Sequence, residues 1–320
     1  MIARIGKPGT SNPGNPSESV ESVFAGVPVC RSVARCVCHI IVATTLALGT
    51  VSMFGCDGLF FHPTRRVYAS PDEHRLRYER VSIPTHDGLK LDGWFFPAAD
   101  GPARGTVVHF HGNAGNITGH FEHVAWLPAT GWNVLCFDYR GYGRSQGRPT
   151  RKGLVLDGHA AIEYVKTRGD VDPARIIVLG QSLGGAVGIV VAAERKDIAG
   201  LAVDGAFSHY RRIAAWHIRR NPLLFMLAWW VPALILPGQD PIDHVARVAP
   251  TPLFIMHGRA DEVVDPRMAE ELYAAAGEPK ELWLIDGVGH YTALDELANV
   301  ARPKLLQFFN RCVDGTGKTG

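Results

Sequence analysis

Short apolar runs alternate with helix-length segments through most of this chain, and this alternation limits the folds open to it. The central runs are continuously apolar, as in strands covered on both faces, which favours a parallel sheet between helical layers. Strands are predicted at 79–84, 89–96, 105–111, 132–138, 175–180, 200–204, 252–257 and 281–286. Helices are predicted at about 117–129, 151–168, 183–195, 266–276 and 293–310. The pattern indicates an α/β fold with a mostly parallel, eight-stranded sheet and helices on both faces. Only the turn His86-Asp87-Gly88 separates the first two strands, so these should form an antiparallel hairpin.

Composition excludes several classes of function. The chain is 46% apolar and 20% charged, with a net charge of +2, so it offers no overall field that would attract nucleic acid. Its six cysteines do not fall in zinc-binding spacings with histidines. We therefore expect an enzyme-sized domain over residues 57–320 that binds neither nucleic acid nor a metal ion.

The first 56 residues form a separate region. Residues 1–35 contain a stretch rich in Pro, Gly, Ser and Asn, which predicts a disordered leader. Arg31 and Arg35 then precede 36–56, which contains no Asp, Glu, Lys or Arg and is about long enough to cross a bilayer. The end of this run resembles a bacterial lipoprotein signal, with Cys56 as the possible lipidated residue. An uncleaved anchor and a buried apolar helix in a soluble chain are the alternatives. Attachment to a membrane, with the following domain outside the cytoplasm, is the expectation.

The sequence Gly180-Gln181-Ser182-Leu183-Gly184 lies between an apolar strand and an apolar helix. This G-x-S-x-G pattern in a strand–turn–helix context is typical of a nucleophile elbow, in which small residues allow a sharp turn that exposes the serine hydroxyl. Free N–H groups at the start of the helix would lie beneath it. The alternative is an ordinary turn with Ser182 as a helix N-cap. We predict Ser182 as a nucleophile.

A serine nucleophile needs a histidine base and a carboxylate that orients it. His290 is the best candidate for the base, because it lies in a small-residue loop just after the last strand. His209, His217, His244 and His257 are less favourable in position. Asp261, which follows the strand at 252–257, is the predicted acid. Asp204 at the end of the preceding strand is its rival, and Asp265 has the position of a helix N-cap.

An oxyanion hole needs two backbone N–H donors. One should come from Leu183, which follows the nucleophile. The other should come from the glycine-rich loop after the third strand, where Asn113 is the predicted donor. Asn116 is better explained as the N-cap of the next helix. No metal or organic cofactor is required by this chemistry.

Five motifs occur in order along about 75–310: HGNAGN (111–116), DYRGYGRSQGRPT (138–150), GQSLGGAVG (180–188), HGRADEVVD (257–265) and GVGH (287–290). Together they resemble the α/β-hydrolase superfamily, and in particular its membrane-anchored members related to serine aminopeptidases and to dienelactone hydrolase-like enzymes. In such families the aspartate of the H-G-x-x-D motif is the triad acid, which favours Asp261 over Asp204. The resemblance also implies that Asp138 and Arg140 support the site structurally.

The segment 205–250, between the sixth and seventh strands, is where this fold accepts a lid. Residues 221–239 carry no charged side chain, but a membrane span there would separate Ser182 from Asp261 across the bilayer, which a triad forbids. Two interpretations stay open: a cap helix packed on its own domain, or an apolar lid that touches a bilayer or an acyl substrate. The lid or pocket residues would be Trp216, Phe225, Trp229 and Trp230.

The expected function is a serine hydrolase that cleaves a carboxylic ester or thioester of a small acyl substrate. A serine (amino)peptidase is the alternative within enzymes. It would need carboxylates to hold a substrate ammonium group. The lid region offers mainly Asp240 and Asp243 for this, beside the four arginines at 211, 212, 219 and 220. A non-catalytic, membrane-associated scaffold is the alternative outside enzymes. Its usual mark is the loss of a triad residue, and none is missing here.

Overall fold

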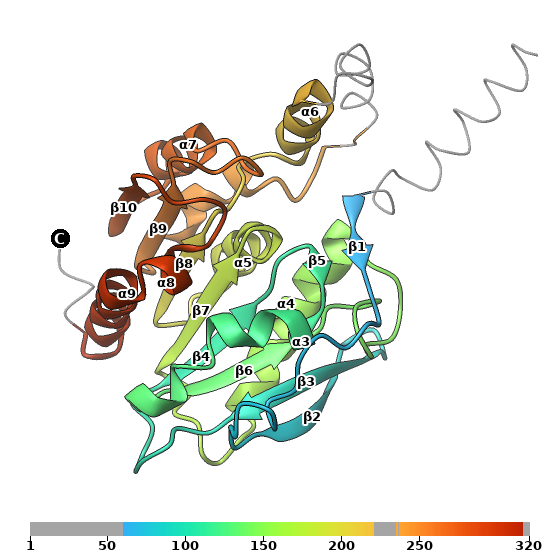
Figure 1. Ribbon diagram of the computed structural model, residues 1–320, viewed down its shortest axis with the longest axis vertical. Coiled ribbons are helices and arrows are strands. Elements are labelled where there is room, and N and C mark those ends of the chain that lie inside the picture. The colour runs from blue at the N-terminus through green and yellow to red at the C-terminus, as the bar shows by residue number, and fades with distance from the viewer. Residues whose placement is uncertain (1–59, 221–234, 236, 316–320) are drawn as a thin grey trace, which may run out of the picture. The chain divides into compact units, whose positions relative to one another are not determined.

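A mixed sheet of eight strands forms the centre of the protein. The computed structural model describes residues 60–220, 235 and 237–315. Across the sheet the strands follow the order β10-β9-β8-β7-β4-β6-β3-β2 (Figure 1). Their bounds are β2 (Glu79–Pro84), β3 (Lys90–Phe96), β4 (Thr106–Phe110), β6 (Asn133–Phe137), β7 (Ile176–Gln181), β8 (Gly200–Asp204), β9 (Leu253–Gly258) and β10 (Lys280–Ile285). The eight predicted strands are therefore all confirmed, with ends that move by at most one residue.

The pairing of the strands also agrees with the sequence. β4 pairs in parallel with both β6 and β7, and β7, β8, β9 and β10 continue the parallel arrangement. β2 and β3 form the antiparallel hairpin, and β3 is antiparallel to β6 as well. The predicted α/β fold, with a mostly parallel sheet, is confirmed. Because the parallel strands end on one edge, the loops that follow them meet there.

Helices cover both faces of the sheet (Figure 1). On one face lie α4 (Arg151–Lys166), α5 (Leu183–Glu194) and α7 (Arg267–Ala275), and on the other lie α3 (Ile117–His120), α8 (Ala293–Glu296) and α9 (Ala298–Val313). Alternate residues of β7 contribute to the hydrophobic cores on the two faces of the sheet. Val178 packs in the core beneath α4, α5 and α7, and Ile177 and Leu179 pack in the core beneath α3, α8 and α9. This double burial explains why the central strands are mostly apolar on both faces.

Two predicted helices differ in the structure. The segment 117–129 is not one helix: α3 ends at His120, and two 3₁₀ turns follow, η1 (Phe121–His123) and η2 (Pro128–Thr130). Pro128 has no backbone N–H to donate, so a longer helix through it would lack that hydrogen bond. The segment 293–310 is divided into α8 and α9 at Leu297, whose ψ of 39° is not helical. Sequence periodicity continued across both breaks and gave no sign of them.

Several segments were not predicted or cannot be compared. A short parallel pair, β1 (His62–Pro63) with β5 (Ala114–Gly115), is too brief to give a periodic signal. Helix α6 (Tyr210–Arg220) begins the predicted lid region. The segment 36–56 with Cys56, and the lid residues Phe225, Trp229 and Trp230, lie outside the described residues. Within the described part of the chain, no helix has the length and apolar character needed to cross a membrane.

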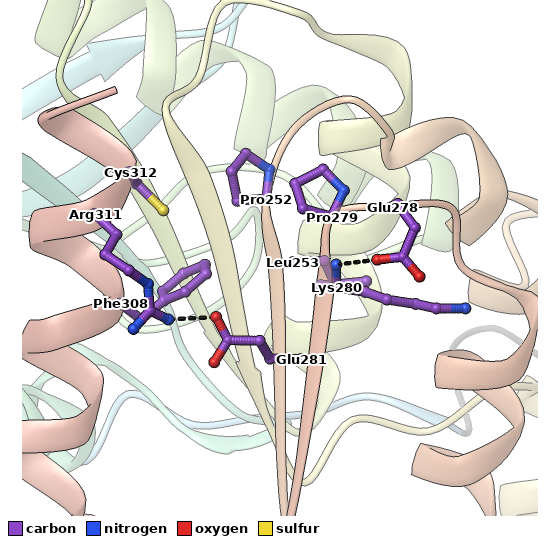
Figure 2. A pocket seen from close by; sticks show the side chains of 9 residues that line it. All are labelled: Pro252, Leu253, Glu278, Pro279, Lys280, Glu281, Phe308, Arg311 and Cys312. Carbon is purple, nitrogen blue, oxygen red and sulfur yellow. Dashed lines mark hydrogen bonds and ion pairs between the residues drawn. The ribbon is translucent and has the colours of Figure 1, made fainter. Parts of the chain in front are cut away.

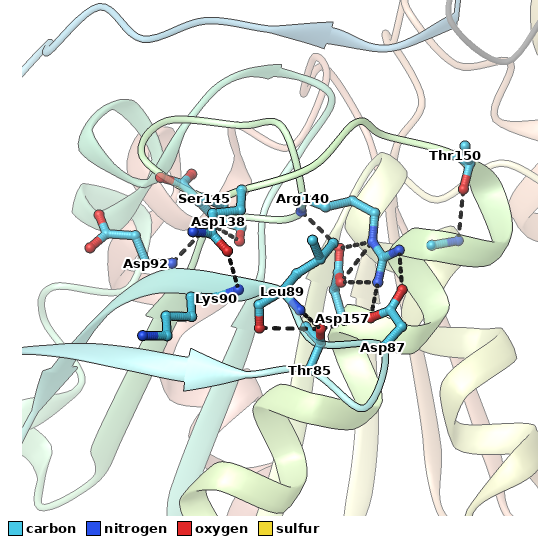
Figure 3. Close-up of polar contacts among 12 residues, drawn as sticks. Thr85, Asp87, Leu89, Lys90, Asp92, Asp138, Arg140, Ser145, Thr150 and Asp157 are labelled. Carbon is cyan, nitrogen blue, oxygen red and sulfur yellow. Dashed lines mark hydrogen bonds and ion pairs between the residues drawn. The ribbon is translucent and has the colours of Figure 1, made fainter.

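A buried polar network joins the hairpin to α4 (Figure 3). The guanidinium of Arg140 donates to both carboxylate oxygens of Asp157, at 2.8–3.1 Å, and also to Asp87 at 2.8 and 3.2 Å. The Arg140 backbone N–H donates to Asp157 Oδ2 at 2.8 Å as well. The Asp157 side chain is fully buried, so its contacts are shielded from water, whereas the Asp87 side chain is partly exposed. The supporting role expected for Arg140 follows from this geometry.

Replacing Asp157 with Asn should destabilise the fold strongly. The change leaves the buried face of the Arg140 guanidinium without its charge partner, and breaking a buried pair in this way costs about 3 kcal/mol of unfolding free energy. Asp170→Asn is the matched control, because Asp170 pairs with Arg168 at the surface and such pairs contribute at most about 1 kcal/mol. Urea unfolding followed by tryptophan fluorescence measures both. Equal losses in the two variants would contradict the prediction.

Candidate active site

The turn from β7 into α5 has the geometry of a nucleophile elbow. Ser182 lies at the turn with φ 53° and ψ −114°, a strained backbone conformation for a residue with a side chain. Glycines allow the close approach around it. A Cβ at Gly184 would lie 1.9 Å from the Phe110 carbonyl oxygen, and one at Gly180 would lie 2.4 Å from the Gly184 oxygen. The G-x-S-x-G spacing is therefore a steric requirement of this turn.

The Ser182 hydroxyl is not used to cap the helix. Ser182 precedes α5, but its side chain accepts no hydrogen bond from the first turn, as an ordinary N-cap serine would. Its backbone N–H donates instead to the Asp204 carbonyl oxygen at 2.8 Å, which ties the elbow to the end of β8. This leaves the hydroxyl available for chemistry and argues against the N-cap interpretation.

His290 lies in the loop after β10, close to this elbow. Its Nδ1 is 2.7 Å from Asp261 Oδ2. A Cβ added at Gly205, the residue after Asp204, would be 3.1 Å from both Cε1 and Nδ1 of His290. The imidazole therefore packs over Gly205. The residue before it, Asp204, accepts from the Ser182 N–H. Within the described residues no hydrogen bond joins the Ser182 hydroxyl to His290, and catalytic hydrogen bonds often tighten only when substrate binds.

The Asp261 carboxylate accepts from four donors. Oδ1 accepts from the N–H groups of Val263 and Val264 at 2.8 and 2.9 Å, and Oδ2 lies 2.7 Å from His290 Nδ1 and 3.0 Å from His257 Nε2. Burial alone would raise the pKa of Asp261, but the hydrogen bonds from His257 and His290 outweigh it and hold that pKa well below its usual range. The carboxylate is thus ionised and oriented toward His290.

Sequence reasoning missed His257 as a partner of Asp261. It set this histidine aside as part of the end of a strand, which is where β9 places it. The signal that could have found His257 is its position four residues before Asp261. Gly258 is the last residue of β9, and Asp261 N–H donates to the Gly258 carbonyl oxygen, so a tight turn separates the two side chains. His257 is fully buried, so its role is to hold the carboxylate rather than to meet a substrate.

Asp204, the rival acid, is not paired with His290. It is buried at the end of β8, and its Oδ2 has no hydrogen-bond partner among the described residues. Burial raises its pKa to about 7, because the charged form loses its hydration. The structure brings Asp261, not Asp204, into contact with the histidine.

The predicted oxyanion donors flank the elbow. Leu183 is the first residue of α5, so its N–H has no carbonyl partner within the helix. Gly112, in the loop after β4, lies beside Ser182, since a Cβ there would be 3.8 Å from that of Ser182. Asn113 follows, and among the described residues its backbone N–H donates to no acceptor. Asn116 accepts from Thr118 N–H at 2.9 Å, which confirms it as the N-cap of α3.

Asp138 and the cap helix complete the surroundings. Asp138 is buried, and its Oδ1 accepts from Ile117 N–H at 2.8 Å and lies 3.4 Å from His111 Nε2, so it supports the loop that carries Asn113.

On α6, the Trp216 indole donates to the Glu262 carbonyl oxygen at 3.2 Å, next to Asp261. Burial and the nearby charge of His290 lower the pKa of His217 on the same helix. Helix α6 therefore lies against the acid and histidine loops.

A small cleft elsewhere does not belong to this site. It has a volume of about 90 Å³ and is lined from the starts of β9 and β10 and the end of α9, with Leu253, Lys280 and Cys312 among its residues (Figure 2). The site residues follow the other ends of these strands, roughly 17 Å away for a strand of six residues. No group of three His, Cys, Asp or Glu in the described ranges could hold a metal ion.

The fold and the arrangement at its strand ends define an α/β hydrolase. A family model described as serine aminopeptidase, S33, matches residues 101–248 and 228–296, and the chain belongs to this family. The uncharacterized protein YfhR of Escherichia coli K12 is 37% identical over 255 residues, which cover 78% of this chain and 85% of YfhR. The α/β-hydrolase domain-containing protein WAV2 of Arabidopsis thaliana is 32% identical, with coverage of 65% and 69%. The esterase Pf2001 of Pyrococcus furiosus is similar in structure, with a TM-score of 0.64, 25% identity and coverage of 79% and 98%.

Replacing Asp204 with Asn should remove a loss of stability that occurs as the pH rises. With a pKa of 3.8 unfolded and about 7 folded, Asp204 keeps its proton only in the folded chain between these values. The free energy of unfolding of the wild type therefore falls as the pH rises from about 4 to about 7. Asn does not titrate, so the stability of Asp204→Asn relative to the wild type should increase over this range and then level off.

Urea unfolding at a series of pH values measures this difference. Asp286→Asn is the control, because the Asp286 side chain is almost fully exposed and should give a difference that does not vary with pH. A constant difference between Asp204→Asn and the wild type would contradict the prediction.

Proposed function

We propose that this α/β hydrolase is a serine hydrolase that cleaves carboxylic ester or thioester bonds through Ser182, His290 and Asp261. The observation that carries the proposal is the 2.7 Å contact between His290 Nδ1 and an ionised Asp261, beside a strained serine whose hydroxyl caps no helix. Membership of a hydrolase family supports hydrolysis in general. The likeness to an esterase favours an ester substrate.

The proposed chemistry follows from the hydrogen bonds. Because Asp261 Oδ2 accepts from Nδ1–H of His290, the other ring nitrogen is free to act as a base. It removes the proton of the Ser182 hydroxyl as the oxygen attacks the acyl carbonyl. The N–H groups of Leu183 and Asn113 stabilise the resulting oxyanion. His290 then protonates the leaving group, and water, activated by the same histidine, releases the acid from the acyl-enzyme.

The preferred acyl group is proposed to be moderately apolar. Trp216 is half-buried on α6 beside the acid loop, where its ring could contact a substrate. Phe225, Trp229 and Trp230 extend the apolar character of the lid in the sequence and are proposed as further pocket residues. An aromatic lid favours burial of a hydrocarbon chain over a polar substrate.

An aminopeptidase activity is the second candidate, because the matching family model carries that description. Such an enzyme must hold a substrate ammonium group with carboxylates. The cap helix α6 carries Arg211, Arg212, Arg219 and Arg220, and the exposed Glu262 nearby lies 3.7 Å from Arg220. This charge balance disfavours a cationic substrate.

Ser182→Ala should abolish both labelling by a fluorophosphonate probe and hydrolysis of p-nitrophenyl esters. Asp261→Asn should keep the serine but lower kcat by roughly 10³–10⁴, since the histidine loses the partner that orients it. Asp265→Asn is the matched control: Asp265 is four residues away and accepts from Arg267 N–H, although the N-cap of α7 is Pro266 and not Asp265 as expected. It should stay within about twofold of the wild type.

A substrate panel separates the candidates. Turnover of esters from acetate to laurate, with a preference for longer chains, supports the proposal and the apolar lid. Turnover of aminoacyl amides well above that of esters would favour the peptidase. A folded wild type that neither reacts with the probe nor hydrolyses any substrate would overturn the proposed triad. It would favour the alternative of a non-catalytic, membrane-associated scaffold.

We further propose that the protein is held at a membrane by 36–56, with its catalytic domain outside the cytoplasm. The support is the uncharged run behind Arg31 and Arg35 in the sequence. Lipidation of Cys56 after cleavage and an uncleaved anchor are the two proposed forms of attachment.

The full chain should sediment with membranes and resist extraction by carbonate. If Cys56 is lipidated, labelled palmitate should enter the wild type and not Cys56→Ala, whereas Cys312→Ala, a buried cysteine of α9, should keep the label. An uncleaved anchor predicts membrane association in all three proteins without label. Recovery of the wild type in the soluble fraction would contradict membrane attachment.

A further inference from the structure

Residues 60–66, here called the N-terminal strap, run alongside the loop that carries the proposed oxyanion donor. β1 of the strap pairs in parallel with β5 of the loop, with His62 opposite Ala114 and Pro63 opposite Gly115 (Figure 1). Thr64 N–H also donates to the Gly115 carbonyl oxygen at 3.4 Å. This small sheet is separate from the eight-stranded one. It links a segment far away in the sequence to the loop beside Ser182.

The side chain of Asn113 makes the closest connection between strap and loop. Its Nδ2 donates to the Phe60 carbonyl oxygen at 2.7 Å, and its Oδ1 accepts from His62 N–H at 3.1 Å. The Tyr142 hydroxyl donates to the same Oδ1 at 2.8 Å. Both ends of the amide are therefore engaged, and two of the three partners are backbone groups of the strap.

A second asparagine ties the far end of the loop. Asn116 Nδ2 donates to the carbonyl oxygens of Thr64 and Arg66 at 2.9 and 2.8 Å. Thr64 also accepts from Gly143 N–H at 3.1 Å. The strap is thus held along its length by polar groups from two loops, which fixes its own path.

The loop needs such support because its glycines leave its backbone free to adopt several conformations. Gly112 lies on one side of Asn113, and Gly115, with φ +99°, follows two residues later. Glycine restricts the backbone less than any other residue, so the direction of the Asn113 N–H must be set by contacts from outside the loop. That N–H donates to no acceptor among the described residues, whereas the side chain of the same residue is bonded three times.

We infer that the strap is a positioning element of the oxyanion hole. The Asn113 side chain donates to the Phe60 carbonyl oxygen and accepts from the His62 N–H and the Tyr142 hydroxyl, and these bonds hold the Asn113 peptide so that its N–H points toward the oxygen of the reacting carbonyl. The inference rests on the proposed function, and it adds groups that touch no substrate. An oxyanion donor acts on the transition state more than on the bound substrate, so misdirecting it should lower kcat and leave KM nearly unchanged.

The test uses the full chain and four single variants. Asn113→Ala removes all three side-chain bonds, Tyr142→Phe removes one, and His62→Pro removes the strap N–H. His62→Ala is the matched control, because it keeps that N–H and the side chain of His62 is exposed. Complete loss of an oxyanion donor lowers kcat by 10²–10³, so a misdirected donor should lower it by roughly tenfold to hundredfold in Asn113→Ala. Tyr142→Phe and His62→Pro should show smaller losses, and His62→Ala should match the wild type.

The rate is expressed per serine that reacts with the fluorophosphonate. A purely structural defect would reduce the number of reactive sites and leave kcat per site unchanged, whereas a misdirected donor lowers kcat per site with KM within about twofold. The double variant His62→Pro/Asn113→Ala should be no slower than Asn113→Ala, because both changes break the same connection. Tyr142→Phe alters no backbone group, so it keeps the test decisive if His62→Pro misfolds.

Wild-type kcat per site in both Asn113→Ala and Tyr142→Phe would overturn the inference while the serine hydrolase stands. Additive losses in the double variant would also overturn it, since strap and Asn113 would then act separately. Absence of labelling in the wild type would count against the proposed function itself.

Discussion

Close contact between the elbow and the neighbouring strand is the constraint on which the site depends. Gly184 lies so near the Phe110 carbonyl oxygen that no side chain fits, and this contact sets the strained turn at Ser182. The same contact places the start of α5 beside the loop that follows β4. The proposed nucleophile and the proposed oxyanion donors are thus brought together by main-chain packing.

The rest of the site is organised around a single buried carboxylate. Asp261 is satisfied by two backbone N–H groups and two histidines, so its charge is stabilised although its side chain is buried. Asp204, nearby, has no such donors for its Oδ2, and its pKa rises to about 7. Below about pH 7 these two aspartates at adjacent strand ends therefore differ in charge, because hydrogen bonds stabilise the ionised form of Asp261 and burial disfavours that of Asp204.

Much of this architecture could be predicted because the local pattern and the fold agree. Strands such as β7 and β9 are buried at every position and mostly apolar, and the glycines of the elbow stand where the turn requires them. The breaks at Phe121 and Leu297 were missed because periodicity continues across them. The short β1–β5 pair was missed because two residues carry no period.

The sequence by itself determined where the strands lie along the chain, the elbow at Ser182 and the short set of histidines and aspartates that could serve it. It favoured Asp261 over Asp204 as the acid, first by position and then by the family resemblance, but it could not show which of the two carboxylates contacts the histidine. Only the tertiary structure decided that His290 contacts Asp261, that His257 shares this carboxylate and that the N-terminal strap binds Asn113. Such contacts join residues distant in the chain, and their distances depend on how the strand ends pack rather than on any local preference.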